Sequence, residues 1–251
     1  MATLNELYNE LWLDVSPNIS DDSVLDERLL KAFIHKMRAL FARNEMNKSH
    51  RSVDAVLIQD LGLVELETTD MLAEVGLSNI HYTVLKTVEE IPAPLELHNK
   101  QAFTFIGPFN QMNKGFKIVD YGAIPYAGHG RFNQQFMYAV YMNKHIYIIG
   151  NCNNPAFKGL KYIGVKGVFE NPEDAERFYT PTGDPCYTDD SPYPLPLYMW
   201  AYCKKEILQT DLRQFYVALE DPLNNATNDL TRLTDNRRRN YRDRNNEETN
   251  D

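Results

Sequence analysis

This chain of 251 residues lacks the features that mark nucleic-acid coats, membrane proteins and secreted proteins. Its 35 acidic residues outnumber 26 basic ones, and the net charge of −9 argues against general phosphate binding, which a basic surface drives. The longest apolar run, residues 136–142, is far shorter than the roughly 20 residues of a membrane-spanning helix. No apolar core of a secretory signal precedes Arg28, the first basic residue. We therefore expect a protein made in the cytoplasm, with no membrane span.

Cysteine is scarce as well. Cys152, Cys186 and Cys203 are odd in number and widely spaced, with no Cys-x-x-Cys pair and no histidine spacing typical of zinc. We expect reduced, buried thiols. Three aspartates within residues 184–190 could offer carboxylates to Ca²⁺, but they lack the glycine and terminal glutamate of an EF-hand. The sequence therefore predicts no metal site and no cofactor.

The N-terminal part of the chain has the periodicity of helices. Thr3 and Glu6 stand at capping-box spacing, which predicts a helix over residues 3–14. Beyond Pro17, Ser23 can cap a second helix over residues 24–47. Its apolar stripe, which we expect to be core, comprises Leu25, Leu29, Leu30, Phe33, Ile34, Met37, Leu40 and Phe41.

From Leu61 onward the pattern changes to short runs typical of strands. These runs cover residues 63–68, 82–88, 102–106, 117–121, 136–142, 145–149 and 162–169. Asn143-Lys144 fits a hairpin turn, and Asn171-Pro172 predicts a short helix that ends near Phe178. After a proline-rich loop, helical spacing predicts a long final helix with Leu208, Leu212, Phe215, Tyr216 and Leu219 on one face.

Together these patterns predict an α+β fold: a helical bundle with an inserted antiparallel β domain and an extended C-terminal tail. The bundle would consist of two N-terminal helices and a long C-terminal helix. We predict four divisions of the chain. Residues 1–60 form an N-terminal helical pair, and residues 61–180 form the inserted β domain. Residues 181–222 form a loop and a helix that complete the bundle, and residues 223–251 form a polar partner-binding tail.

Two segments suggest sites. Glycines flank His129 beside Arg131, which could expose an imidazole, but no nucleophile or orienting acid is near in sequence. We therefore predict no catalytic residues and interpret this loop as a contact with a neighbouring subunit; the alternative is a small soluble enzyme that uses His129. A run at residues 159–166 has a superficial likeness to a phosphate loop, but it lacks the Gly-Lys pair and is typical of a strand.

The second segment is a basic cluster in the tail. It consists of Arg237, Arg238, Arg239, Tyr241, Arg242 and Arg244. Such a cluster fits either nucleic acid or an acidic surface on a partner subunit, and the acidity of the chain favours the protein partner.

Several short strings, in one order, resemble a structural protein from the neck and tail of crAss-like bacteriophages. They are residues 38–66, Pro94-Leu-Glu-Leu-His98, Gly167-Val-Phe-Glu-Asn-Pro-Glu-Asp-Ala175, Pro185-Cys186, Asp189-Asp190 and Tyr193-Pro194. Proteins of this kind resemble the tail adaptor of short-tailed phages. The resemblance implies a non-enzymatic virion protein, assembled in the host cytoplasm. It further implies a homo-oligomeric ring of about twelve copies between the portal and the adjacent tail rings, through which the genome passes.

Overall fold

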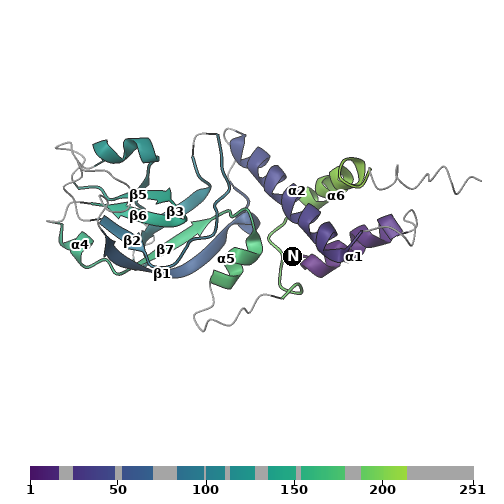
Figure 1. Ribbon diagram of the computed structural model, residues 1–251, viewed down its shortest axis with the longest axis horizontal. Helices are drawn as coiled ribbons and strands as arrows, with labels where there is room; N and C mark the ends of the chain where they lie inside the picture. Colours follow the sequence, from purple (N-terminus) through teal and green to yellow (C-terminus); the bar gives the residue numbers. More distant parts are fainter. Residues whose placement is uncertain are drawn as a thin grey trace, which may run out of the picture.

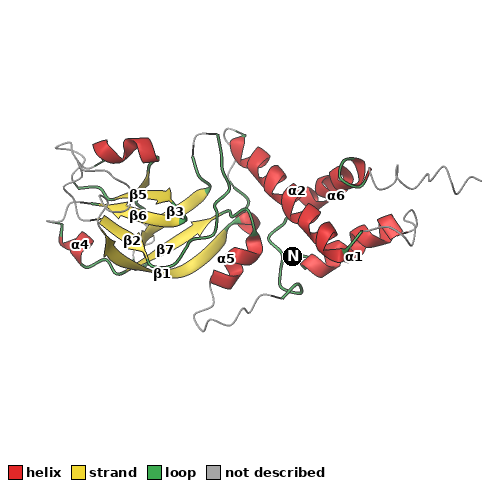
Figure 2. Ribbon diagram, in the orientation of Figure 1, coloured by secondary structure: helices red, strands yellow, loops and turns green. Residues whose placement is uncertain are grey.

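A computed structural model of the chain shows a sheet with three helices, α1, α2 and α6, gathered beside one end of it (Figures 1 and 2). It describes residues 1–16, 25–48, 53–69, 84–98, 100–110, 114–127, 135–150, 154–178 and 188–213.

Helix α1, Leu4–Val15, begins as the sequence predicts. The Thr3 hydroxyl accepts a hydrogen bond from the Glu6 backbone N–H at 3.1 Å, and the Glu6 carboxylate accepts one from the Thr3 N–H at 3.0 Å. These two bonds form the capping box and satisfy backbone donors that a helix start leaves free. Helix α2, Glu27–Asn47, starts three residues later than predicted, with Asp26 as its N-cap residue; Ser23 lies outside the described residues.

The buried face of α2 differs from the predicted stripe. The residues that the helix buries are Leu30, Ile34, Met37, Arg38 and Ala42. Phe33 and Phe41 are only partly buried at the edge of the core, and Leu40 is 45% exposed. The prediction of a core position is therefore wrong for Leu40, whereas Phe33 and Phe41 pack against the core without being fully buried. An arginine occupies a central position instead, which an apolar periodicity cannot anticipate.

The sheet has seven strands in the order β3-β7-β1-β2-β6-β5-β4. Their bounds are β1 Gln59–Thr69, β2 Val84–Thr87, β3 Phe103–Pro108, β4 Lys117–Ile118, β5 Tyr138–Met142, β6 His145–Ile149 and β7 Tyr162–Gly167. Neighbouring strands are antiparallel except for the parallel pair β4 and β5. The two edges nearly meet, because the Phe116 N–H, just before β4, donates to the Ile106 carbonyl in β3 at 2.7 Å. The sheet is therefore a nearly closed, barrel-like structure.

Local strand signals place the sheet correctly. Each predicted run overlaps one strand, and residues 162–166 of the apparent phosphate loop lie in β7. Asn143 and Lys144 link β5 to β6 with backbone φ angles of 50° and 64°, which confirms the predicted hairpin turn. The shorter helices are η2 Ala55–Leu57, η3 Tyr121–Tyr126, α4 Pro155–Lys158 and α5 Pro172–Phe178.

The predicted fold class is nevertheless wrong. The described chain is a mixed α+β structure whose main body is the barrel-like sheet, and not a helical bundle with an inserted β domain. The core beneath α1, α2 and α6 also includes Leu57, Leu95 and Val168 from segments that flank the strands, so these helices do not form a separate body. Helical periodicity identifies a buried face without identifying what covers it.

The end of the chain requires a second correction. Helix α6 spans Leu197–Gln209 and lies mostly before the stripe that predicted a long final helix. Leu212 is buried in the turn that follows, and Phe215 and the whole of residues 223–251 lie outside the described residues.

Candidate functional site

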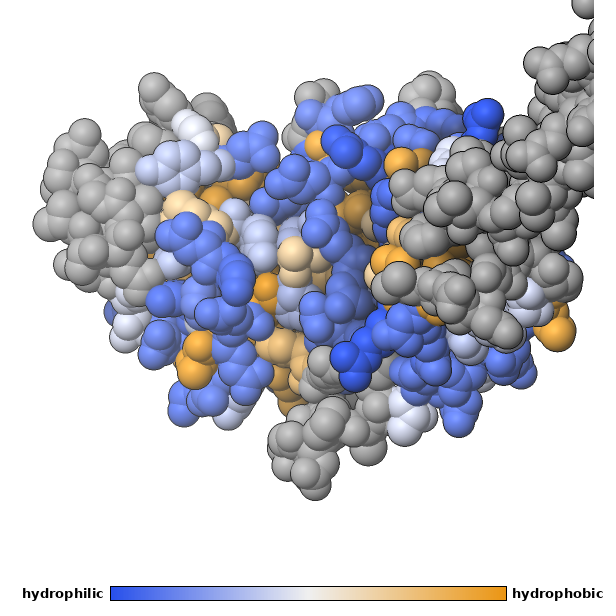
Figure 3. Space-filling model, turned by 45° about the vertical axis from the view of Figure 1, so that its right-hand side comes forward, coloured by the Kyte–Doolittle hydropathy of each residue, from blue (hydrophilic) through white to orange (hydrophobic). Residues whose placement is uncertain are grey.

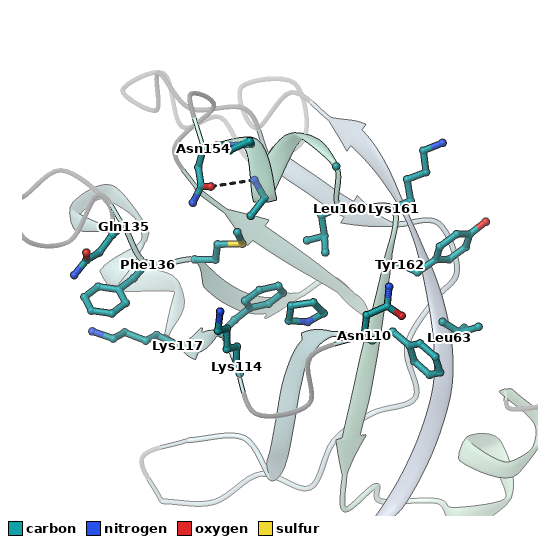
Figure 4. A pocket seen from close by; sticks show the side chains of 18 residues that line it. Leu63, Asn110, Lys114, Lys117, Gln135, Phe136, Asn154, Leu160, Lys161 and Tyr162 are labelled. Carbon is teal, nitrogen blue, oxygen red and sulfur yellow. Dashed lines mark hydrogen bonds between the residues drawn. The ribbon is translucent and has the colours of Figure 1, made fainter.

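A groove of about 910 Å³ opens at the end of the sheet that lies beside α4, away from α1, α2 and α6 (Figures 1 and 4). Five segments distant in sequence build it: residue 63 of β1, residues 108–110 at the end of β3, residues 114–117 before and within β4, residues 135–137 before β5, and residues between 154 and 162, from α4 to β7.

Helix α4 forms one side of the groove and is fixed by its own sequence. The Asn154 side chain accepts a hydrogen bond from the Ala156 N–H at 3.0 Å, and Pro155 occupies the first turn, where no N–H partner is needed (Figure 4). Phe157 is 2% exposed and packs onto the backbone at Gly150. A Cβ at Gly150 would lie 2.6 Å from a Phe157 ring carbon, so glycine is required for this close approach.

A second glycine positions the opposite wall. A Cβ added at Gly107 would lie 2.7 Å from the Phe105 ring and 2.9 Å from the Lys114 carbonyl oxygen. Glycine thus lets residues 114–116 pass directly over β3, where Phe116 makes its backbone hydrogen bond. The groove is consequently preformed by backbone packing rather than by long side chains.

Large apolar side chains line the groove and are unusually exposed. Leu63, Phe109, Phe136 and Tyr162 are each between 37% and 56% exposed. Figure 4 shows Leu63 and Tyr162 on one side of the groove and Phe136 on the other. Such a concentration of exposed apolar surface is typical of an interaction site.

The charge of the groove is opposite to that of the chain. Lys114, Lys117 and Lys161 contribute to its lining, and none of the described lining residues is Asp or Glu. The Lys117 ammonium lies 3.6 Å from the centroid of the Phe136 ring, a cation–π contact that holds the charge at the groove edge. The groove therefore favours a partner that is apolar and carries acidic groups.

Apart from the groove, a cluster of polar side chains lies where α2 meets the sheet. Arg38 is fully buried; its Nε donates to the Pro194 carbonyl and its Nη1 to the Phe169 carbonyl, each at 2.9 Å. Its Nη2 has no hydrogen-bond partner among the described residues, and its guanidinium lies 5.9 Å from the Tyr193 ring centroid. Burial lowers the pKa of Arg38, but two carbonyl dipoles and the ring stabilise the charge.

His35 adds a second tie at this joint. Its Nδ1 lies 2.8 Å from the Tyr193 hydroxyl and its Nε2 lies 3.0 Å from Glu173 Oε1, which joins α2 to α5 and to the segment before α6. Burial lowers the pKa of His35, while the Glu173 carboxylate opposes that change. Tyr193 is fully buried, so this chain of contacts offers no exposed nucleophile and acts as a structural link.

The predicted site residues are not placed by the structure. His129, Arg131 and the cluster of Arg237, Arg238, Arg239, Tyr241, Arg242 and Arg244 lie outside the described residues. Within the described ranges, no group of three or more His, Cys, Asp or Glu residues could hold a metal ion, and no helix is long and apolar enough to cross a membrane. Asp190, one of the three aspartates considered for Ca²⁺, accepts a hydrogen bond from Asn5 at 2.8 Å. Of the three cysteines, Cys203 is a buried free thiol, and its burial raises its pKa to about 12.

Sequence reasoning missed the groove. The only available signal is the alternation of aromatic and lysine residues, as in Phe116-Lys117 and Lys161-Tyr162. These pairs are more than 40 positions apart, and only the strand order brings them to one surface.

The family model described as phage tail ring protein 2 matches residues 6–230, which is most of the chain and includes every strand that the structure describes, α2 to α6 and all but the first two residues of α1. No curated protein matches the chain.

Proposed function

The chain belongs to the phage tail ring protein 2 family, whose members are structural proteins of the phage tail, and from that premise we propose that it is one subunit of a closed ring in the virion. The ring has about twelve copies, lies between the portal and the distal tail, and surrounds the path of the genome. Subunits are made in the host cytoplasm and join the particle there.

The observation that carries this proposal is the groove. It is preformed, lined by exposed apolar side chains and edged by lysines, and its described lining contains no histidine, cysteine or carboxylate. A pocket for acid–base catalysis requires converging titratable groups, whereas a docking surface requires apolar anchors with a charged rim. The groove therefore supports a function through packing against other chains, without turnover.

The basic tail supplies a second contact in this proposal. Arg237, Arg238, Arg239, Arg242 and Arg244, with Tyr241 among them, donate charge-assisted hydrogen bonds to an acidic surface of a neighbouring subunit, and the loop with His129 and Arg131 adds to the contact. Since these bonds are electrostatic, removal of residues 223–251 weakens assembly most at low salt.

Quantitative mass spectrometry of purified virions tests the proposal. We expect about twelve copies per particle, in the same ratio to the portal in independent preparations. Absence of the chain from mature particles would contradict a structural role in the tail.

A further inference from the structure

The groove is chemically complementary to one segment of the chain, residues 214–230, here called the acidic segment. It contains Glu220, Asp221 and Asp229 and no lysine, arginine or histidine. Its large apolar residues are Phe215, Tyr216, Val217, Leu219, Leu223 and Leu230. The described lining of the groove has the opposite charge, with three lysines and no acid around exposed apolar side chains. A docking surface selects partners by this combination of apolar contact and opposite charge.

The acidic segment is part of the sequence that the family model covers. The match ends at residue 230, whereas the described residues end at 213. The matched sequence therefore includes the whole acidic segment and stops before the basic cluster. The acidic segment is thus a feature of the ring protein itself, and a role in assembling the ring is consistent with its place in the matched sequence.

The groove gathers its apolar side chains in one hollow. Leu63, Phe109, Phe136 and Tyr162 come from four segments, and all of them line it. The face that is seen with the helical end turned forward is different, because its described residues are largely hydrophilic and its apolar patches are separate (Figure 3). An apolar segment can therefore bury several side chains together in the groove.

The acidic segment begins far from the groove of its own chain. It follows α6 in the helical group, while the groove lies beside α4 at the other end of the long axis (Figure 1). A compact body of about 200 residues is roughly 40 Å across, and this molecule is longer than that along its long axis. The stretch from residue 213 to residue 223 extends at most about 35 Å. A groove that receives residues 215–223 therefore belongs to another copy.

We infer that the groove of each subunit receives the acidic segment of a neighbouring copy of this chain. The inference rests on the proposed ring and names one of its interfaces. Apolar side chains of residues 215–223 pack on those of the groove, and Glu220 and Asp221 face Lys114 and Lys161. Segment and groove are different surfaces, so the contact is head to tail, and a closed ring leaves neither of them unused.

Nucleic acid fits the groove less well. A phosphate backbone would use the lysines but would leave the exposed apolar side chains of the groove without a partner. The basic cluster that follows the acidic segment lies, in this arrangement, on the same neighbouring subunit. The two parts of the tail then bind one neighbour through opposite charges.

Charge reversal in the full-length protein tests this interface. The groove variant is Lys114→Glu with Lys161→Glu. The segment variant is Glu220→Lys with Asp221→Lys. Each variant places like charges across the contact, so mass photometry at low salt should show the apparent Kd for assembly raised about tenfold or more.

Two control variants make the same changes of charge outside both surfaces. They are Arg43→Glu with Lys100→Glu, matched to the groove variant, and Glu89→Lys with Glu96→Lys, matched to the segment variant. All four positions are exposed, and the apparent Kd of both controls should be unchanged. Circular dichroism should show that the groove variant remains folded, since Lys114 and Lys161 are exposed as well.

Combining the substitutions distinguishes a contact between copies from one within a copy. A single chain that carries both pairs of substitutions again has opposite charges at the contact, so its Kd should return to within about threefold of the original. An equal mixture of the groove variant and the segment variant should also assemble. In the mixture each groove attracts the segment of the other variant, which gives rings in which the two variants alternate.

The other outcomes separate the inference from the proposed function. If the unsubstituted protein forms no oligomer, the proposed ring and this interface are both overturned. If it assembles, the ring stands, and this interface is overturned when both variants assemble normally or when the chain with both pairs of substitutions does not recover. Recovery of that chain without recovery of the mixture would place the segment in its own groove and overturn the contact between copies. A loss confined to the groove variant would assign the groove to another occupant, such as nucleic acid, and overturn it too.

Discussion

The two ends of the molecule are held together by different physical means. At the helical end, polar side chains that are buried or partly buried join separate elements: Arg38 bonds two backbone carbonyls, and His35 bridges Tyr193 and Glu173. At the groove end, close packing joins the elements instead. The backbone approaches its neighbours closely at Gly107 and Gly150, and the ring of Phe157 is buried against Gly150. Buried polar ties are sensitive to charge and pH, whereas close packing is sensitive to volume. The groove end thereby leaves its lysines available to a partner.

The largest effect should come from Arg38. Replacing it with alanine leaves the Phe169 and Pro194 carbonyls without these donors and opens a cavity, so Arg38→Ala should lower the free energy of unfolding by about 3 to 5 kcal/mol. Urea denaturation measures it. Arg43→Ala, an exposed position on the same helix, is the control and should change stability by less than about 0.5 kcal/mol. Equal stabilities for the two variants would show that Arg38 is not a structural tie.

The packing at the groove end should respond next. Gly150→Ala forces a methyl group against the Phe157 ring and should cost about 1 to 3 kcal/mol, measured by thermal melting. Gly122→Ala is the control, because no atom lies within 4 Å of the added Cβ, and it should be neutral or slightly stabilising. A neutral Gly150→Ala would mean that α4 is not pressed onto the sheet as described.

The pH dependence of the helical end comes third. Burial lowers the pKa of His35 in the folded state, so the unfolded chain binds the proton more readily. Stability is therefore greatest above the ordinary histidine pKa of about 6.5 and falls as pH decreases from there toward the folded-state pKa, at no more than about 1.4 kcal/mol per pH unit. The neighbours that face His35 are Glu173, Asp189, Tyr193 and Arg38.

Comparison with a variant isolates this contribution. His35→Gln should flatten the slope of unfolding free energy between pH 7.5 and about 5.5, as followed by urea denaturation at each pH. An unchanged slope would assign the pH dependence to other groups.

The smallest effect should come from Glu176. Burial and the charge of Glu173 raise its pKa, so its ionised form is disfavoured in the folded protein. Glu176→Gln should raise the free energy of unfolding by less than about 1 kcal/mol at pH 7. This gain should shrink as pH falls toward 4, because the Glu176 carboxyl group of the original protein then becomes protonated in both the folded and the unfolded state. Exposed Glu89→Gln, measured in parallel melts, is the control. If Glu176→Gln instead lowers stability, the ionised carboxylate makes a stabilising interaction in the folded protein.

Local chemistry determined what could be predicted. The capping box of Thr3 and Glu6 and the hairpin at Asn143-Lys144 depend on neighbours in sequence, and both are confirmed. The burial of Arg38 depends on carbonyls more than 130 positions away, and the exposure of Leu40 depends on which faces of α2 are covered. An apolar periodicity shows neither the carbonyls that bind Arg38 nor which faces of α2 are covered.

The fold-class prediction was wrong, and the groove was not predicted, for the same reason. Recognising a barrel-like sheet requires the order of its strands, and the short strand β4 is placed by a parallel pairing with β5. The groove gathers Leu63, Phe109, Phe136 and Tyr162 from four segments, each of which is ordinary by itself. The family resemblance, by contrast, depended on the order of short strings along the chain, and the match over residues 6–230 confirms it.

The most direct test of the ring is native mass spectrometry of the assembled full-length protein. We expect one dominant closed oligomer of about twelve subunits, which dissociates through loss of subunits from a single type of interface. A protein that remains monomeric at every concentration, or that stops at a symmetric dimer, would contradict it.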